Sequence, residues 1–174
     1  GSGDEPTRKT SRPSTPSVEQ AYELDEELLN LAEALSAPNR RSLLLVGAPG
    51  TGKTALVREL ARRRADLGFA HTAFWTTSAA RLMSGPVGFG MWQERCQNLC
   101  REVARTKAIL HLGNLSELTE VGKVNRDGQS VGGFLRPWLA RGEVFAIAEV
   151  TPEQLAAIGR TEPNLLTAFQ TWPL

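Results

Sequence analysis

The residues with the clearest chemistry form the stretch GAPGTGKT, which runs from position 47 to position 54. It fits the pattern GxxxxGK followed by Ser or Thr, in which glycines let consecutive backbone N–H groups converge on one anion. The lysine of such a loop reaches the terminal phosphates of a nucleotide, and the next hydroxyl ligates magnesium. The stretch predicts a site for ATP and Mg²⁺, the alternative being a glycine-rich turn that only connects two elements. The predicted contacts are Gly47, Ala48, Pro49, Gly50, Thr51, Gly52, Lys53 and Thr54, with Thr54 as the metal ligand.

The loop has the flanking elements that such a site needs. Residues 42–46, SLLLV, form a short apolar run typical of a strand buried on both faces of a parallel sheet. Residues 53–65 predict a helix, so the anion site should lie at a helix N-terminus.

Strand and helix patterns alternate along the rest of the chain. Apolar runs predict further strands at 69–76, 108–112, 143–150 and 169–174. Apolar spacing predicts helices at 22–35, 91–105, 134–140 and 151–158, the last with Thr151 as its N-cap, whereas 122–133 is expected to be a polar loop. This order predicts an α/β domain with a mostly parallel sheet.

Composition excludes several other classes of protein. The chain has 174 residues, 41% of them hydrophobic, which suits one folded domain. No apolar run approaches the ~20 residues of a membrane span, and a net charge of +1 gives no global case for nucleic-acid binding. Residues 1–18 lack a secretory signal and predict a tail or linker that opens with an expression scar, which leaves 19–174 as the domain.

Two cysteines bear on metal binding and on cellular location. Cys96 and Cys100 share one face of a predicted helix and could offer half of a zinc site. Neither His71 nor His111 has metal-ligand spacing relative to them, so buried, reduced thiols are the expected state. Reduced thiols imply a cytoplasmic protein.

Four segments resemble one family. The stretch LLLVGAPGTGKTALVRELARR resembles the phosphate-loop segment of AAA+ ATPases. Residues 82–96, LMSGPVGFGMWQERC, are similar to the pore-loop segment of Clp-type unfoldases and disaggregases, and 134–143, FLRPWLARGE, resembles that family's LLKPxLARGE. Residues 148–155, AEVTPEQL, stand where the family has its sensor segment ATTxxEY.

The resemblance covers about residues 24–169 and implies a fold. That fold is the large subdomain of an AAA+ module, a three-layer P-loop NTPase with five parallel strands in the order 5-1-4-3-2. The small helical lid that the family adds after the fifth strand is expected to be absent, because the sequence ends at that strand.

The sequence departs from the family at the end of the third predicted strand. The family has an aspartate and then a glutamate there, which order the magnesium-bound water and polarise the attacking water. Gly113 and Asn114 occupy these positions. An amide can orient a water but cannot accept its proton, so the nearby Glu117 is the one candidate substitute.

Two further departures concern the subunit interface and the pore. The family's arginine fingers correspond to Thr167 and Ala168, and Arg160 is out of register with them. Gly88 replaces the pore-loop tyrosine, so Phe89 is the candidate residue for gripping a polypeptide, with anchoring of the loop as the alternative. Trp92 and Trp138 are expected in the core or at a subunit interface. Arg136, Arg141 and Glu143 belong to a segment that lies near the subunit boundary in the family, and a solvated face explains these charges equally well.

These observations leave three functions to compare. The missing carboxylates and fingers favour an ATP-binding module with little or no hydrolysis, which controls assembly or shape with other AAA+ subunits. The alternative is an active ATP-hydrolysing unfoldase motor that acts on a polypeptide. A small-molecule P-loop kinase ranks last, because the arginine-rich lid of such enzymes is missing.

Overall fold

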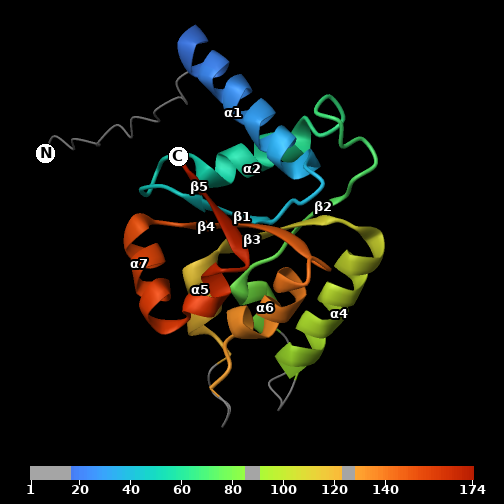
Figure 1. Ribbon diagram of the computed structural model, residues 1–174, viewed down its shortest axis with the longest axis vertical. Coiled ribbons are helices and arrows are strands. Elements are labelled where there is room, and N and C mark those ends of the chain that lie inside the picture. Colours follow the sequence, from blue (N-terminus) through green and yellow to red (C-terminus); the bar gives the residue numbers. More distant parts are fainter. Residues whose placement is uncertain (1–16, 85–90, 123–127) are drawn as a thin grey trace, which may run out of the picture.

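A five-stranded sheet runs through the centre of the domain (Figure 1). The computed structural model describes residues 17–84, 91–122 and 128–174. Every neighbouring pair of strands is parallel, and the order is β2-β3-β4-β1-β5, which confirms the predicted 5-1-4-3-2 read from the other edge. The strands are β1 (Ser42–Val46), β2 (Phe74–Thr76), β3 (Ile109–Asn114), β4 (Phe145–Val150) and β5 (Phe169–Pro173).

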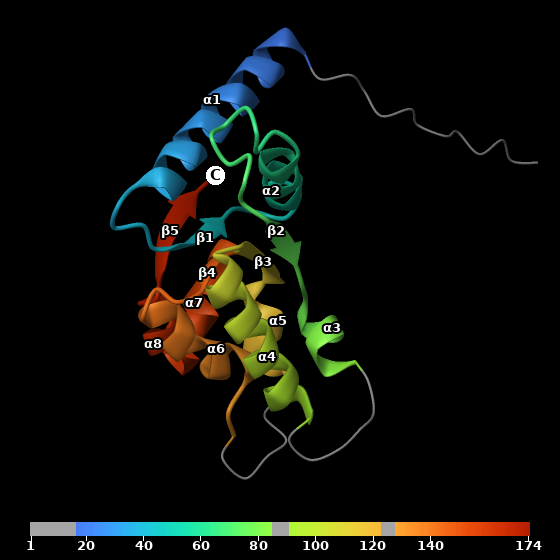
Figure 2. The same cartoon turned by 90° about the vertical axis from the view of Figure 1, so that its right-hand side faces the viewer.

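Helices cover both faces of the sheet, which confirms the three-layer architecture. Figure 2 shows α1 and α2 on one side of the sheet and α4 to α8 on the other. Within the described ranges, no helix combines the length and apolarity that crossing a membrane requires. The helices are α1 (Val18–Ser36), α2 (Lys53–Arg62), α3 (Ala79–Met83), α4 (Met91–Thr106), α5 (Leu115–Glu120), α6 (Val131–Ala140), α7 (Pro152–Thr161) and α8 (Pro163–Leu166).

Strand β1 is buried on both faces, as the run SLLLV predicts. Leu43 and Leu45 pack into the core under α1 and α2, whereas Leu44 faces the core on the side of α4 and α6. Successive side chains of a strand point to opposite faces, so one short strand contributes to two hydrophobic cores. The phosphate loop follows directly from this strand, which holds it in place.

The two cysteines lie in the core on the α4 side, as expected. Cys96 and Cys100 are both 0% exposed and unbonded to each other. Burial raises the pKa of each thiol to about 12. Across the described residues, no group of three or more His, Cys, Asp or Glu side chains could hold a metal ion.

Several predicted boundaries were wrong. Only Phe74–Thr76 of the expected strand 69–76 is extended, because the preceding residues form turns that place Phe69 in the core. The expected polar loop at 122–133 ends early, because Ser130 caps α6 and its hydroxyl accepts a hydrogen bond from the Gly133 N–H at 2.9 Å. Helix α5 was not predicted, and β3 continues to Asn114.

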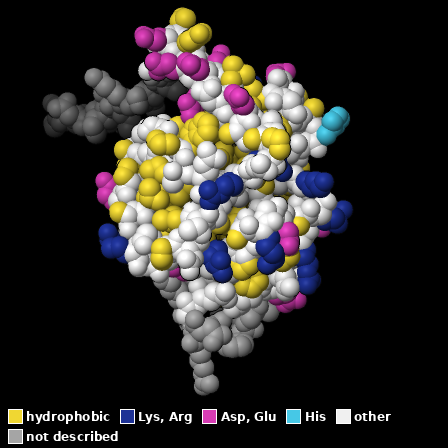
Figure 3. All heavy atoms as spheres, in the orientation of Figure 1, with side chains coloured by type: hydrophobic (Ala, Val, Ile, Leu, Met, Phe, Trp, Pro, Cys, Tyr) yellow, Lys and Arg dark blue, Asp and Glu magenta, His cyan; other side chains and the backbone are white. Residues whose placement is uncertain are grey.

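Charged side chains are spread unevenly over the face of the molecule that Figure 3 shows. Figure 3 shows acidic side chains around the upper end of the molecule, where α1 lies, and most of the basic ones lower and to the right. Because all five strands are parallel, their carboxyl ends lie together at one end of the sheet, which includes the phosphate loop, and their amino ends lie together at the opposite end. These are called the carboxyl edge and the amino edge below.

Candidate functional site

The loop between β1 and α2 has the shape of an anion-binding loop. Gly50 and Gly52 adopt left-handed φ angles of 81° and 85°, a conformation that only glycine adopts without strain. No atom lies within 4 Å of the place where a Cβ of either residue would stand. Gly52 is also the N-cap of α2 and makes no side-chain cap, so the free N–H groups of the first turn open towards the loop.

Lys53 folds its side chain into this loop. Its Nζ donates hydrogen bonds to the carbonyl oxygens of Gly47, at 2.5 Å, and of Ala48, at 3.0 Å. An ammonium group, the N–H groups of a helix N-terminus and the hydroxyl of Thr54 are together the donor set that a nucleotide polyphosphate requires. The residues present therefore fit the polyphosphate that the sequence predicts.

A cavity of about 500 Å³ lies beside the loop at the carboxyl edge. It brings together side chains from the loop, from α2, from the ends of β2, β3 and β4, and from the start of α7. Parallel α/β sheets bind their ligands at this edge. The lining residues are Pro49, Lys53, Thr54, Arg58, Thr76, Thr77, Ser78, His111, Gly113, Asn114, Glu149, Thr151 and Gln154.

Gly113 and Asn114, which stand where the family has its two acidic residues, both line the cavity. The side-chain amide of Asn114, however, is already hydrogen-bonded to other residues. Its Oδ1 accepts a hydrogen bond from the Glu117 N–H at 3.3 Å, which caps α5, and its Nδ2 donates to Gln154 Oε1 at 2.9 Å. Gly113 has a φ of 71° and follows a register shift in β3, so its backbone is already unusual. The structure does not bring Glu117 into the cavity, since its side chain is exposed on α5.

The carboxylate in the cavity comes from a position that the sequence analysis did not single out. Glu149, in β4, stands opposite Asn114 of β3. Its Oε1 accepts a hydrogen bond from Thr54 Oγ1 at 2.6 Å, and its Oε2 lies 2.5 Å from Nε2 of His111. The side chains of Glu149 and His111 are each only 8% exposed. The signal was present in the sequence, as single polar residues inside the apolar strands ILHL and FAIAEV.

Glu149 is held in its charged form. Burial acts to raise the pKa of its carboxyl group, but the hydrogen bonds from His111 and Thr54 and the charges of His111 and Lys53 outweigh burial. The net result is a pKa below the ordinary value of a glutamate. The cavity therefore contains a carboxylate next to the hydroxyl of the predicted metal ligand.

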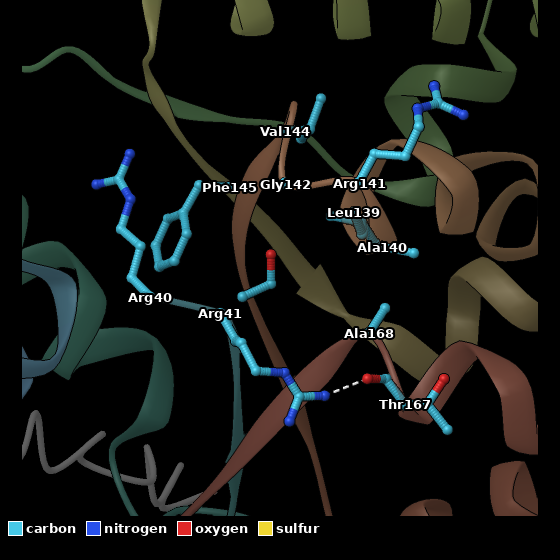
Figure 4. A pocket seen from close by; sticks show the side chains of 11 residues that line it. Arg40, Arg41, Leu139, Ala140, Arg141, Gly142, Val144, Phe145, Thr167 and Ala168 are labelled. Carbon is cyan, nitrogen blue, oxygen red and sulfur yellow. Dashed lines mark hydrogen bonds between the residues drawn. The ribbon is translucent and has the colours of Figure 1, made fainter. Parts of the chain in front are cut away.

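The positions predicted for arginine fingers lie at the amino edge. Thr167 and Ala168 line a cavity of about 250 Å³ together with three arginines, Arg40, Arg41 and Arg141 (Figure 4). The Arg41 guanidinium donates a hydrogen bond to the Thr167 carbonyl oxygen, so an arginine that sequence reasoning missed stands at this position.

Each of the other two arginines has an aromatic partner. Arg40 lies 4.5 Å from the ring centroid of Phe145, and burial lowers its pKa. Arg141 lies 5.3 Å from the ring centroid of Trp138 and pairs with Glu143 at 2.8 Å.

The remaining candidates are spread over the surface and the core. Arg160 is exposed in α7 and does not line the amino-edge cavity. Trp92 is buried and packs edge-to-face on Phe134 with their centroids 5.7 Å apart, which agrees with its expected place in the core. The pore-loop candidate Phe89 and the neighbouring Gly88 lie outside the described residues.

Comparison with known proteins decides the family. Residues 21–163 match the AAA ATPase domain family. The chain belongs to this family. Among relatives of this AAA ATPase domain, the chaperone protein ClpB 2 of Parasynechococcus marenigrum is 30% identical over 150 residues, and ClpB of Mycoplasma pneumoniae is 29% identical over 153 residues. Each match covers 84% of this chain but only 17% and 21% of the relative, so the chain spans about a fifth of their length.

Solved structures show the same fold. The S. cerevisiae Hsp104–ADP complex matches with a TM-score of 0.70 and 23% identity over 86% of this chain and 21% of Hsp104. The closed state of Hsp104 with ATPγS and FITC-casein also has a TM-score of 0.70, over 90% of this chain and 28% of that one. The AAA ATPase domain described here therefore shares the P-loop fold of Hsp104.

Proposed function

We propose that the chain is an ATP-binding AAA ATPase module that hydrolyses ATP slowly or not at all, and that nucleotide occupancy controls its assembly or shape. One contrast supports this. The phosphate loop is complete, whereas the end of β3 has no carboxylate, only Gly113 and Asn114, whose amide is already hydrogen-bonded to Glu117 N–H and Gln154. A base must lie within hydrogen-bond reach of the proton that it removes. Neither Gly113, which has no side chain, nor Asn114, whose amide cannot accept a proton, can act as that base.

The residues of this chain divide the proposed binding between them. Lys53 exchanges the carbonyl oxygens of its own loop for phosphate oxygens, and the N–H groups of the first turn of α2 donate to the same anion. Thr54 would hold Mg²⁺, which neutralises phosphate charge when bound.

The partners proposed follow from the relatives. Hsp104 has been solved with casein, so a polypeptide is one partner class proposed here. Other AAA+ subunits are the second, in line with the resemblance of the sequence to Clp-type proteins. We place the protein in the cytoplasm, which suits two buried, reduced thiols. The alternative function is an active unfoldase motor, with Arg41 in place of the family's fingers and a base supplied from outside the described residues.

Binding and turnover measured on the same sample separate the two functions. We expect the protein to bind Mg·ATP in calorimetry, and Lys53→Ala to weaken that affinity by about 100-fold, because charge-assisted hydrogen bonds are lost. Lys107→Ala is the matched control, since Lys107 is exposed and lies at the amino edge. Its affinity should equal that of the wild type.

Single-turnover kinetics then test hydrolysis. Loss of the base alone typically costs a factor of about 10² or more in rate, so we expect little product on the time scale of an ordinary AAA ATPase. An ordinary rate that Lys53→Ala abolishes would establish the motor function instead. Absence of any Mg·ATP binding by the wild type would reject both functions.

A further inference from the structure

We propose that Glu149 orients the metal ligand Thr54, and so supplies from β4 the acidic support that β3 lacks, with His111 as the residue that positions Glu149. This inference rests on the proposed nucleotide binding. It concerns how the chain itself would hold magnesium beside a bound nucleotide.

The direction of one hydrogen bond carries the argument. A threonine hydroxyl has one proton to donate and two lone pairs. In this structure the Thr54 hydroxyl donates its proton to Glu149 Oε1, with 2.6 Å between the two oxygens. The lone pairs of Thr54 are then free to face the cavity, which is the arrangement that a metal-ligating hydroxyl requires. Groups that fix a ligand in this way typically account for 10- to 100-fold in metal affinity.

His111 holds the second oxygen of the same carboxylate. Its Nε2 lies 2.5 Å from Glu149 Oε2, and its side chain is as deeply buried as that of Glu149. With one oxygen fixed by His111, the other stays within reach of Thr54. Three segments that are far apart in sequence, α2, β3 and β4, thus meet at one carboxylate.

The burial of Glu149 and the absence of a side chain at Gly113 both support the proposed role of Glu149 beside Thr54. A carboxylate buried to this degree is costly unless its charge is paired and hydrogen-bonded. Gly113 offers no side chain, and the nearest atom to a Cβ there would be the Thr77 carbonyl oxygen, 3.9 Å away. Space beside the loop is therefore open at the position where β3 lacks its acid.

The test measures metal binding rather than turnover. Mn²⁺ serves as the probe, and its affinity for the complex of the protein with a non-hydrolysable ATP analogue is followed by electron paramagnetic resonance. We expect Glu149→Gln to weaken Mn²⁺ binding by about 10- to 100-fold. Affinity for the analogue in EDTA should change by less than about twofold, because phosphate contacts remain with Lys53 and the loop. Glu117→Gln is the matched control and should leave both affinities unchanged.

A double-mutant cycle separates this role from a purely structural one. If Glu149 acts through Thr54, the effect of Glu149→Gln on Mn²⁺ affinity should vanish in a Thr54→Val background. Full additivity of the two effects, or an unchanged Mn²⁺ affinity in Glu149→Gln, would overturn the inference. Should Glu149→Gln not fold, Glu149→Asp keeps the charge but draws it back from Thr54; the same loss of Mn²⁺ affinity is expected, and an unchanged value overturns the inference.

His111→Asn tests the positioning residue. Its side chain can still donate a hydrogen bond but is shorter, so we expect a smaller loss of Mn²⁺ affinity than for Glu149→Gln; a larger loss would reject the positioning role. Failure of the wild-type protein to bind the analogue in the presence of Mg²⁺ would reject the proposed function, whereas normal analogue binding with an unaltered metal response would reject only this inference.

Discussion

The two edges of the sheet hold polar groups in different ways. At the carboxyl edge, side chains from separate elements contact one another, as Thr54 does with the buried Glu149, and Glu149 with the buried His111. At the amino edge, three arginines line a cavity, and their partners are the Thr167 carbonyl oxygen, two aromatic rings and the exposed Glu143 (Figure 4). A network that joins several elements fixes geometry, whereas exposed arginines remain available to a partner. The connected side chains at the carboxyl edge support the nucleotide site proposed there.

The largest effect on stability is expected from a buried contact at the amino edge. Ser42 Oγ accepts a hydrogen bond from the Ala146 N–H at 3.0 Å, and both residues are buried. Ser42→Ala leaves that N–H unsatisfied, so we expect the free energy of unfolding to fall by about 1–3 kcal/mol. Thermal denaturation checks this, with the exposed Ser36→Ala as the control. Nucleotide affinity should stay the same; a large change would mean that the two edges are coupled.

A smaller loss of stability, accompanied by a functional effect, is expected from the cap of α7. Thr151 Oγ1 accepts from the Gln154 N–H at 3.2 Å, and Gln154 Oε1 in turn accepts from Thr151 N–H and from Asn114 Nδ2. Thr151→Ala should cost about 1 kcal/mol of folding free energy, and, because these residues line the carboxyl-edge cavity, it should also weaken nucleotide binding. Thr151→Ser keeps the cap and should restore both. Stability lost without any change in affinity would show that α7 does not help to shape the site.

The smallest effect is expected from Arg41, whose side chain is exposed. Arg41→Ala should change the free energy of unfolding by less than about 0.5 kcal/mol, because exposed substitutions rarely do more. Nucleotide affinity measured by calorimetry on the dilute protein should equal that of the wild type. Arg160→Ala, also exposed, is the control. A tenfold change in affinity for Arg41→Ala alone would place this arginine at the nucleotide of a second copy.

The parts of the site that follow a fixed spacing could be predicted from the sequence. The spacing of the phosphate loop located Lys53 and Thr54, and the alternation of strands and helices gave the fold class, while the resemblance gave the strand order. The end of β3 could not be predicted, because a left-handed Gly113 followed by Asn114 resembles a turn but continues the strand. A Gly113→Asp substitution would therefore strain the backbone, a cost of about 1–2 kcal/mol that the sequence does not reveal.

The acid of the site escaped prediction for a different reason. Glu149 and His111 are separated in the sequence, and only the register of β3 against β4 brings them together. Pairing between strands is a long-range property, so the position of a single polar residue in an apolar strand does not predict which residue of another strand it contacts. Boundaries of α5 and α6 were missed because short polar caps, Asn114 and Ser130, begin helices inside stretches that look like loops.

The burial of both cysteines has a practical consequence for spectroscopy. Thiolate is the species that reacts with maleimides and iodoacetamides, and thiols with a pKa of about 12 provide almost none of it at neutral pH. A cysteine introduced at an exposed position, such as Glu117 on α5, should therefore accept a fluorophore or spin label selectively while Cys96 and Cys100 stay in place. The chain can thus be labelled site-specifically on α5 without prior removal of its own thiols.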